Sequence, residues 1–314
     1  QLYNINTLQW DSELLALFGV PAYMLPAVVD SSGTLAVTAS DVLGAEIPVA
    51  GIAGDQQAAL FGQQCVQPGM TKCTYGTGCF LTMNTGETPV YSDHGLLTSI
   101  AWKVGEQLHY VLEGGVFMGG ATLQWLRDGL QFFEDVSECE ALATSVDNCD
   151  GVVMVPALTG LGAPYWDETA RGLIVGITRG TTRAHITRAA LESICYQVND
   201  VIKTMEEDRH EKLAELRIDG GATANNFMAQ FQSDISGIDV IRPDNLETTA
   251  LGAASLAGLG TGFWSRDHLF ERWQVEQKFS PGMSPRVLGN HIDDWHRAVE
   301  RAKHWAKRTD IQPV

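Results

Sequence analysis

Basic residues are scarce in this 314-residue sequence: 21 Lys and Arg stand against 38 Asp and Glu, so the formal net charge is −17 and the pI is near 4.7. Nucleic acids and anionic membrane surfaces are bound through cationic surfaces, and this charge argues against both as partners. An acidic protein can still bind ATP if backbone amides, helix N-termini and a divalent cation meet the phosphate charge. Mg²⁺ is therefore implied wherever ATP is bound.

Cysteine and long apolar stretches are also scarce. The six cysteines form no Cys-x-x-Cys pair and no regular framework, which is typical of reduced thiols in the cytosol rather than of disulfides or zinc sites. Cys79 and Cys195 stand within apolar patterns, so we expect both in the core. No apolar run approaches the roughly 18 residues of a membrane helix. The composition predicts a cytoplasmic protein that does not insert into a membrane.

The glycine-rich fingerprints of two common nucleotide sites are missing as well. The chain contains neither a Gly-x-Gly-x-x-Gly turn between strand and helix nor the sequence Gly-x-x-x-x-Gly-Lys-Ser/Thr. The first absence argues against a Rossmann dinucleotide site and the second against a P-loop. A nucleotide site in this chain would be of another kind.

The segment 47–62 delivers an aspartate into a turn between a strand and a helix. Residues 47–53 are apolar enough for a buried strand, Gly51 and Gly54 allow close backbone approach, and helical spacing resumes directly afterwards. Because α/β proteins place ligands where strands end and helices begin, Asp55 is a candidate catalytic base. The alternative is that Asp55 only caps the helix, since Asp is a preferred N-cap residue.

Two further segments carry glycines at turns. Residues 71–84 have two β-rich arms around Gly76 and Gly78, whose bare amides could cradle phosphate oxygens, although such a hairpin often serves only its turn. A strand at 216–218 ends in Asp219-Gly220-Gly221 before a helical pattern. Paired glycines at such a junction let a flat ring or a phosphate approach the backbone.

The rest of the chain alternates strands and helices. The length exceeds the size at which one core usually keeps growing, so we expect two units. Strands are expected at 72–75, 79–83, 96–102, 108–113 and 152–155. Helices are expected at 8–18, at 117–126 with Gly119 and Gly120 interrupting it, at about 182–207, at 248–258 and at 292–305. In the last helix, Trp295, Val299, Ala302 and Trp305 should face inward.

In this order and spacing the segments resemble the FGGY carbohydrate kinase family, and within it the members that phosphorylate glycerol. The matching motifs are GIAGDQQAALFG, TYGTGCF, EGGVFMGGATLQWLRD, PALTGLGAPYWD, ESICYQ, DGGATANNFMAQFQSD and ALGAASLAG. The resemblance covers almost the whole chain. It implies an α/β, actin-like (ribonuclease-H-like) ATPase fold, of which the chain would hold the second lobe and the tail of the first.

The resemblance also implies a division of the chain. Residues 1–60 would be the C-terminal tail of the first lobe, 61–264 the second, nucleotide-binding lobe, and 265–314 a C-terminal helical extension. The family's phosphate-binding Asp-x-Gly-Thr-Thr hairpin and the Arg-Glu pair that holds the polyol hydroxyls are not found, so the chain would begin in the middle of the family pattern. Alone, such a fragment should be inactive.

The activity implied by the resemblance is ATP-dependent phosphorylation of glycerol to sn-glycerol 3-phosphate. Asp55 would be the general base and would also face the ATP-bound Mg²⁺. Gln56 would contact a glycerol hydroxyl. Phe80 would lay an apolar face against the carbon backbone of the polyol, unless it is simply a core residue of the hairpin.

The nucleotide contacts implied by the resemblance fall on three segments. Thr77 would contact phosphate, Gly120 and Gln124 would contact the nucleotide from a helix, and Gly221 and Asn225 would hold its adenosine end. The alternatives are that Gln124 is only a solvated polar position and that Asn225 is only a helix cap.

Two other functions stay open. A related kinase for pentoses or gluconate would share most of these residues, and a non-catalytic actin-like ATP-binding module would share the fold. A module of that kind would lack an apolar, polyol-facing Phe80 beside Asp55. For the full-length protein the resemblance also implies a homo-oligomer.

Overall fold

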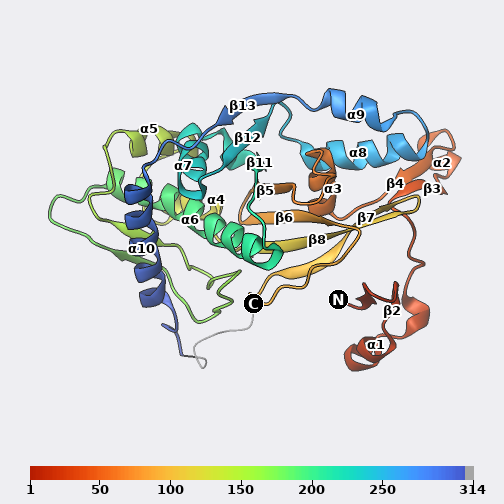
Figure 1. Cartoon of the computed structure of the whole chain (residues 1–314), viewed down its shortest axis with the longest axis horizontal. Coiled ribbons are helices and arrows are strands. Elements are labelled where there is room, and N and C mark those ends of the chain that lie inside the picture. Colours follow the sequence, from red (N-terminus) through yellow and green to blue (C-terminus); the bar gives the residue numbers. More distant parts are fainter. Residues whose placement is uncertain (308–314) are drawn as a thin grey trace.

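The computed structural model describes residues 1–307, apart from the side chain of Phe270. Its body is a seven-stranded mixed sheet (Figure 1). In chain order the strands are β5 (Thr71–Tyr75), β6 (Cys79–Gly86), β7 (Leu97–Val104), β8 (Gln107–Val116), β11 (Glu215–Asp219), β12 (Asp239–Pro243) and β13 (Val275–Phe279). Across the sheet they follow the order β13-β12-β11-β5-β6-β8-β7. β11 pairs in parallel with β5, which brings the carboxyl ends of these two strands to the same edge.

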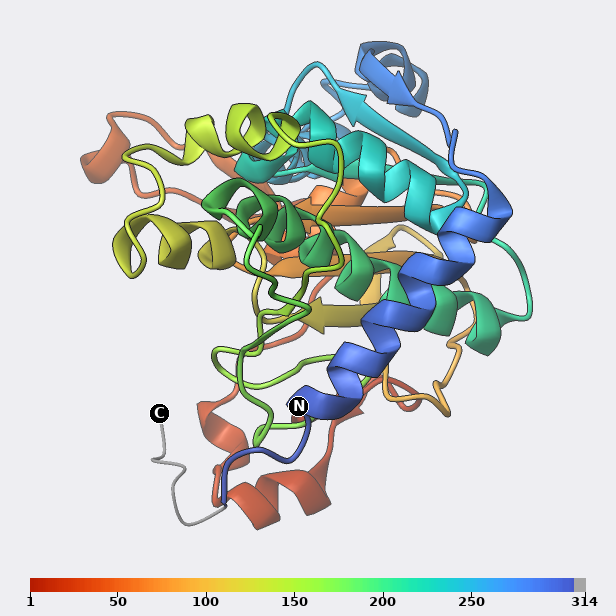
Figure 2. The same cartoon turned by 90° about the vertical axis from the view of Figure 1, so that its left-hand side faces the viewer.

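Helices cover both faces of this sheet. One core holds side chains of α4 (Gly120–Asp128), α5 (Cys139–Thr144), α6 (Arg183–Arg209), α7 (Asn226–Ser236) and α10 (Pro285–Ala302). In Figure 2, α10 (blue) and α6 (green) lie in front of the strands. The other core holds side chains of α3 (Asp55–Gly62) and α8 (Thr248–Gly260). Successive strand residues point to opposite faces, so Leu112 of β8 lies in the first core and its neighbour Val111 in the second.

Several sequence expectations are confirmed. The central helix α6 has a buried stripe that includes Ala190, Ile194, Val198 and Met205. All six cysteines are free and buried, including Cys79 and Cys195. The small residues of α8 allow close approach to α3, because a Cβ added to Gly252 would lie 1.8 Å from the carbonyl oxygen of Ala58.

Two helices begin later than the sequence indicated. The first helix, α1, spans Ser12–Phe18 rather than starting at residue 8, because Gln9–Trp10 pair as β2 with β1 (Tyr3–Asn4). The Asp11 side chain then accepts from the amides of Glu13 and Leu14 and starts the helix. The helix expected at 117–126 is α4, which begins only at Gly120. Gly119 is its N-cap, Gly120 is its first residue, and Phe117 lies outside it.

The expectation for the terminal helix was partly wrong. Trp295, Val299 and Ala302 are buried as predicted, but the helix spans Pro285–Ala302 and Trp305 beyond it is 74% exposed. Pro285 explains the early start, since proline fits the first helical turn. The sequence reading also did not identify α5, β12, β13 or α9 (Arg266–Arg272). No helix within residues 1–307 is both long enough and apolar enough to cross a membrane.

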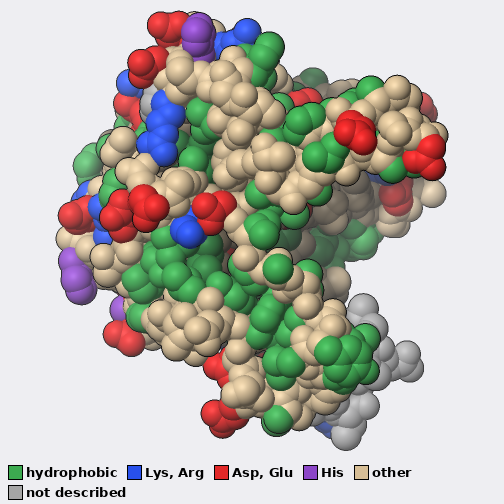
Figure 3. Space-filling model, turned by 90° about the vertical axis from the view of Figure 1, so that its right-hand side faces the viewer, with side chains coloured by type: hydrophobic (Ala, Val, Ile, Leu, Met, Phe, Trp, Pro, Cys, Tyr) green, Lys and Arg blue, Asp and Glu red, His purple; other side chains and the backbone are tan. Residues whose placement is uncertain are grey.

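The N-terminal segment leaves much apolar surface exposed. After α1 it contains the short helix η1 (Ala22–Met24), β3 (Ser32–Val37), α2 (Ser40–Leu43) and β4 (Pro48–Gly51), with β3 and β4 paired antiparallel. Leu17, Tyr23 and Val42 are 76%, 87% and 75% exposed. Figure 3 looks onto this side of the molecule and shows hydrophobic side chains on a projecting lower part, with a hollow above it. Exposed apolar patches of this kind usually mark surfaces that another body covers.

Candidate active site

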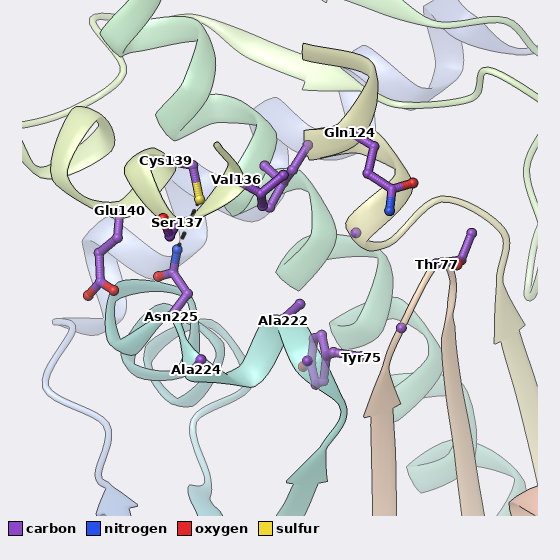
Figure 4. Close-up of a pocket in the computed structure, with 14 residues that line it drawn as sticks. Tyr75, Thr77, Gln124, Val136, Ser137, Cys139, Glu140, Ala222, Ala224 and Asn225 are labelled. Carbon is purple, nitrogen blue, oxygen red and sulfur yellow. Dashed lines mark hydrogen bonds between the residues drawn. The ribbon is translucent and has the colours of Figure 1, made fainter. Parts of the chain in front are cut away.

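A cavity of about 470 Å³ lies at the carboxyl ends of β5 and β11. Its lining includes all five residues expected to contact a nucleotide: Thr77, Gly120, Gln124, Gly221 and Asn225. Figure 4 shows Thr77 and Gln124 on one side of the cavity and Asn225 on the other. The structure thus brings together residues that lie far apart in the sequence.

The turn of the β5–β6 hairpin is locked to the start of α4. The amide of Gly120 donates to the carbonyl oxygen of Gly76 at 2.8 Å, and the amide of Gly119 donates to that of Thr77 at 2.9 Å. The amide of Gly76 itself donates to the carbonyl oxygen of Gly78 at 2.9 Å. The expectation that the Gly76 amide would be bare was therefore wrong, because the turn uses it internally. The exposed Thr77 side chain is the polar group that the tip presents.

The paired glycines after β11 have different reasons to be glycine. Gly220 has φ +91°, and a Cβ there would lie 2.5 Å from the carbonyl oxygen of Tyr75. Only glycine fits such a position without strain. A Cβ on Gly221 would meet no atom within 4 Å, and Gly221 lines the cavity. Gly220 therefore serves the fold, whereas the backbone at Gly221 is left open to the cavity.

Asn225 both caps a helix and lines the cavity. Its Oδ1 accepts from the amide of Met228 at 2.9 Å, which makes it the N-cap of α7, and its Nδ2 donates to the Sγ of Cys139 at 3.4 Å. The capping alternative raised from the sequence is thus present in the structure. An amide has one further donor and one further lone pair, so capping leaves Asn225 able to bond a ligand.

The outer wall of the cavity was missed by sequence reasoning. Val136, Ser137, Cys139 and Glu140 line it, from the short helix η2 (Val136–Glu138) and from α5. A signal was available in the sequence, because Asp135 and Glu138 form a capping box at the start of this short helix. The Asp135 carboxylate accepts from the backbone amide of Ser137, and the Glu138 carboxylate accepts from the backbone amide of Asp135. Burial raises the pKa of the Cys139 thiol, which keeps it neutral in this wall.

Asp55 stands on the other helical face of the sheet, at the first residue of α3. The N-cap is Gly54, and no side chain caps this helix. The alternative that Asp55 is merely the cap is therefore wrong. Its Oδ1 accepts from the amide of Gln56 at 2.8 Å, and the residue is exposed. An exposed carboxylate at a helix start, with one oxygen held by a backbone amide, is placed to accept a proton from a ligand.

Phe80 faces solvent rather than the core. It is 44% exposed and lies on β6 directly opposite Thr74 of β5. Its ring lies beside the backbone of Gly115, where a Cβ would be 3.7 Å away. The alternative of a core phenylalanine is wrong, because alternation along β6 buries Cys79 and Leu81 and leaves Phe80 on the α3 side.

Gln56 contacts a residue that the sequence analysis did not single out. Its Oε1 accepts from the ammonium group of Lys72, which lies on β5 and is fully buried. The signal in the sequence is a lysine inside a strand whose other residues are apolar or small. Lys72 and Thr74 alternate with Cys73 and Tyr75, which belong to the core on the opposite face.

The structure offers a metal few protein ligands. Within residues 1–307, no group of three or more His, Cys, Asp and Glu side chains is arranged to hold an ion. Asp219, the acidic residue nearest in sequence to the paired glycines, is buried and accepts from Gln63 and Thr248 at 2.8 Å each.

Comparison with known proteins identifies the family. Residues 71–261 match the C-terminal domain of the FGGY family of carbohydrate kinases, and residues 1–62 match the N-terminal domain of the same family. The chain belongs to the FGGY family of carbohydrate kinases. This confirms the resemblance drawn from the sequence motifs.

Individual FGGY kinases are similar over nearly the whole chain. A glycerol kinase of Parabacteroides distasonis is 58% identical over 307 residues, which are 98% of this chain and 62% of the relative. A crystal structure of Plasmodium falciparum glycerol kinase with ADP has a TM-score of 0.89 at 36% identity, covering 99% of this chain and 62% of that one. The chain therefore spans about 62% of the length of the curated relatives it matches.

More distant FGGY kinases share the fold. A ligand-bound xylulose kinase of Lactobacillus acidophilus has a TM-score of 0.80 at 21% identity, covering 96% of this chain and 61% of that one. Similarity at this level bears on the fold alone. The α/β, actin-like ATPase fold predicted from the sequence is confirmed.

Proposed function

We propose that the protein phosphorylates glycerol with ATP and releases sn-glycerol 3-phosphate and ADP. The observation that carries this proposal is the 58% identity to a glycerol kinase over 98% of the chain. The arrangement of Asp55, Gln56 and Phe80 supports it, because a carboxylate, an amide and an exposed apolar ring are what a small polyol needs. A non-catalytic ATP-binding module would have no use for an exposed Phe80 near Asp55.

Asp55 is proposed as the general base. The terminal hydroxyl of glycerol attacks the γ-phosphorus of ATP, and its proton passes to the Asp55 carboxylate as the bond to ADP breaks. Phosphoryl transfer depends on in-line positioning and on charge neutralisation more than on covalent chemistry. The hydrogen bond from the backbone amide of Gln56 fixes one carboxylate oxygen of Asp55, so the other oxygen is free to accept the proton.

Gln56 and Phe80 are proposed to bind the acceptor. The side-chain amide of Gln56 would hydrogen-bond a glycerol hydroxyl, while the Phe80 ring would cover the carbon backbone of glycerol. Phe80 is 44% exposed, so it has a face to offer. Covering that face would remove water from the reacting groups, which strengthens every polar interaction there.

The cavity at the carboxyl ends of β5 and β11 is proposed as the ATP site. Thr77 would contact phosphate, Gly120 and Gln124 would contact the nucleotide from α4, and Gly221 and Asn225 would hold the adenosine end. The open space above Gly221 and the unused donor of Asn225 support this assignment. The cavity lies where open α/β sheets usually bind ligands, beyond the carboxyl ends of parallel strands.

Mg²⁺ fits the residues present. Magnesium in phosphoryl-transfer sites is commonly held by one or two carboxylates together with substrate phosphates and waters. Asp55 would be its protein ligand here, which agrees with the absence of a larger acidic cluster within residues 1–307. When bound, the ion would neutralise charge on the β- and γ-phosphates.

We further propose a division of the chain into three parts, with a cytoplasmic location and a homo-oligomer for the full-length protein. Residues 1–60 would complete a first lobe, residues 61–264 would form the nucleotide-binding lobe, and 265–314 would be an extension of it. Two observations support counting the extension with that lobe: β13 lies at the edge of the sheet, and Trp295 is buried in the core that also holds α6.

A coupled assay of ADP release tests the proposed function. The natural protein at its full length should release ADP with glycerol and should do so far more slowly with xylulose or gluconate. An Asp55→Asn variant is the matched control, because it keeps the shape of the side chain and removes the base. Faster turnover with xylulose or gluconate than with glycerol would replace the proposed substrate.

A further inference from the structure

Lys72 is a fully buried lysine whose hydrogen bonds go to neutral oxygens. Its ammonium group donates to Gln56 Oε1, to Thr74 Oγ1 at 2.8 Å and to the carbonyl oxygen of Phe80 at 3.5 Å. No salt bridge to Lys72 is found within residues 1–307. A buried charge without an ionic partner is costly, so its presence calls for a use.

The contact fixes which way the Gln56 amide points. A glutamine amide carries an acceptor oxygen and a donor NH₂ group that are nearly equal in size. An ammonium group has only donors, so it donates to the amide oxygen and cannot form a hydrogen bond with the NH₂ group. Held in this way, Gln56 must turn its NH₂ group away from Lys72. An NH₂ group binds an oxygen lone pair, such as that of a hydroxyl.

Two of the three contacts of Lys72 connect it to residues of the proposed polyol site. Gln56 and Phe80 are the two side chains proposed to bind the acceptor, and Lys72 holds the side chain of one and the backbone of the other. Burial lowers the pKa of Lys72, while anionic groups nearby, Asp219 first and Asp55 among them, oppose that shift.

We propose that Lys72 is a positioning residue for the acceptor: by binding Gln56 Oε1 it presents the Gln56 NH₂ group to a polyol hydroxyl. The inference rests on the proposed function of the site, and it deepens that function by adding a residue that touches no substrate. Lys72 acts through Gln56. Its loss should weaken polyol binding and leave nucleotide binding as it was.

The test is a Lys72→Met substitution in the natural protein at its full length. Methionine is an unbranched apolar side chain only one heavy atom shorter than lysine, and replacing a buried charge by an apolar group is often tolerated. The Michaelis constant for glycerol should rise about tenfold, as expected for the loss of one oriented hydrogen bond to a substrate. The Michaelis constant for ATP should stay unchanged. Lys103→Met, at a 45% exposed lysine on β7, is the matched control and should change neither constant.

A double-mutant cycle separates positioning from a general structural role. Gln56→Ala should also raise the Michaelis constant for glycerol about tenfold. If Lys72 acts through Gln56, adding Lys72→Met to the Gln56→Ala variant should have no further effect. Effects that multiply in the double variant would overturn the proposal, as would an unchanged glycerol constant in Lys72→Met.

A second variant keeps the test decisive if Lys72→Met does not fold. Thr74→Val retains the ammonium group and removes one of its acceptors, so a smaller rise in the glycerol constant is expected. An unchanged constant in this folded variant would refute the idea. The acceptor in all assays is whichever polyol the parent protein phosphorylates. If the parent protein does not phosphorylate glycerol, only the proposed substrate is refuted. The coupling between Lys72 and Gln56 is then tested with the polyol that the parent protein does phosphorylate.

Discussion

The nucleotide cavity and the proposed polyol site differ in which atoms form them: backbone atoms in the first and side chains in the second. The nucleotide cavity is shaped mainly by the backbone. Main-chain hydrogen bonds join the turn at Gly76 to the start of α4, and the backbone at Gly221 after β11 is open to the cavity. The polyol side is shaped by side chains: Asp55, Gln56, Lys72 and Phe80 contact one another or project from adjacent elements. Backbone geometry tolerates substitutions that keep the glycines, whereas a side-chain network depends on each member.

This difference decides what a substitution should do on each side. On the cavity side, a change that adds volume at an open glycine should weaken nucleotide binding without harming the fold. On the polyol side, a change that removes one functional group should affect chemistry or acceptor binding alone. The predictions below test that contrast, beginning with the largest expected effect.

The chain of 314 residues by itself should bind nucleotide weakly and show no measurable phosphorylation of glycerol. The chain spans about 62% of its curated relatives, and Leu17, Tyr23 and Val42 expose apolar surface that another body would cover. Without that body the site stays open to water. Calorimetry with ADP and a coupled assay would check this. Glycerol-dependent ADP release above an Asp55→Asn control would contradict it.

Asp55→Asn in the full-length protein should lower turnover by about 10²–10⁴-fold and leave ATP affinity unchanged, because the amide keeps the shape but cannot take the proton. Asp41→Asn, at an exposed aspartate in the first turn of α2, is the matched control and should keep full turnover. Single-turnover kinetics measures the chemical step directly. Turnover within tenfold of the parent would rule out Asp55 as the base.

The neighbouring glycines 220 and 221 should respond oppositely to alanine. Gly220→Ala forces a Cβ to 2.5 Å from the carbonyl oxygen of Tyr75 at φ +91°, so it should lower the free energy of unfolding by about 3 kcal/mol. Gly221→Ala meets open space and should change stability by less than about 1 kcal/mol. It should nevertheless weaken ADP binding about tenfold or more, because the new methyl group stands where the ligand would lie.

Chemical denaturation and ADP titration of the two variants check this pair. Each variant controls for the other, since the positions are adjacent and the substitution is the same. Unchanged ADP affinity in Gly221→Ala would mean that the nucleotide does not approach this backbone.

The sequence predicted the cavity better than the polyol side for a physical reason. Glycines at strand ends are visible in the sequence, and their positions imply where a ligand can approach. The contact between Lys72 and Gln56 joins a strand to a helix 16 residues away in the chain and depends on packing. Strand alternation would have placed Lys72 on the α3 face, but no local pattern reveals the partner it finds there.

The same reasoning explains the hits and misses in the fold. α6 was predicted nearly to its ends because its stripe of apolar residues continues along most of Arg183–Arg209. The start of α4 was misplaced because Phe117 continues the helical spacing, although the amides of Gly119 and Gly120 bond to the hairpin turn and the helix begins only at Gly120. Trp305 was placed inward by the same spacing, yet the helix has already ended at Ala302. Periodicity predicts a face but not where a helix begins or ends.

Phe80 and Leu81 offer the smallest and sharpest version of the contrast, because they are adjacent on β6 and point to opposite faces. Phe80 is 44% exposed and Leu81 is 1% exposed. Phe80→Ala should raise the Michaelis constant for glycerol up to about tenfold by removing an apolar face, and should cost roughly 1 kcal/mol of stability. Leu81→Ala should cost about 2–5 kcal/mol because it opens a cavity in the main core, and should leave the glycerol constant of the folded enzyme near that of the parent. Steady-state kinetics and urea denaturation of the two variants measure both quantities. If Phe80→Ala left the glycerol constant unchanged, the ring would have no contact with the acceptor, and the polyol side would rest on Asp55 and Gln56 alone.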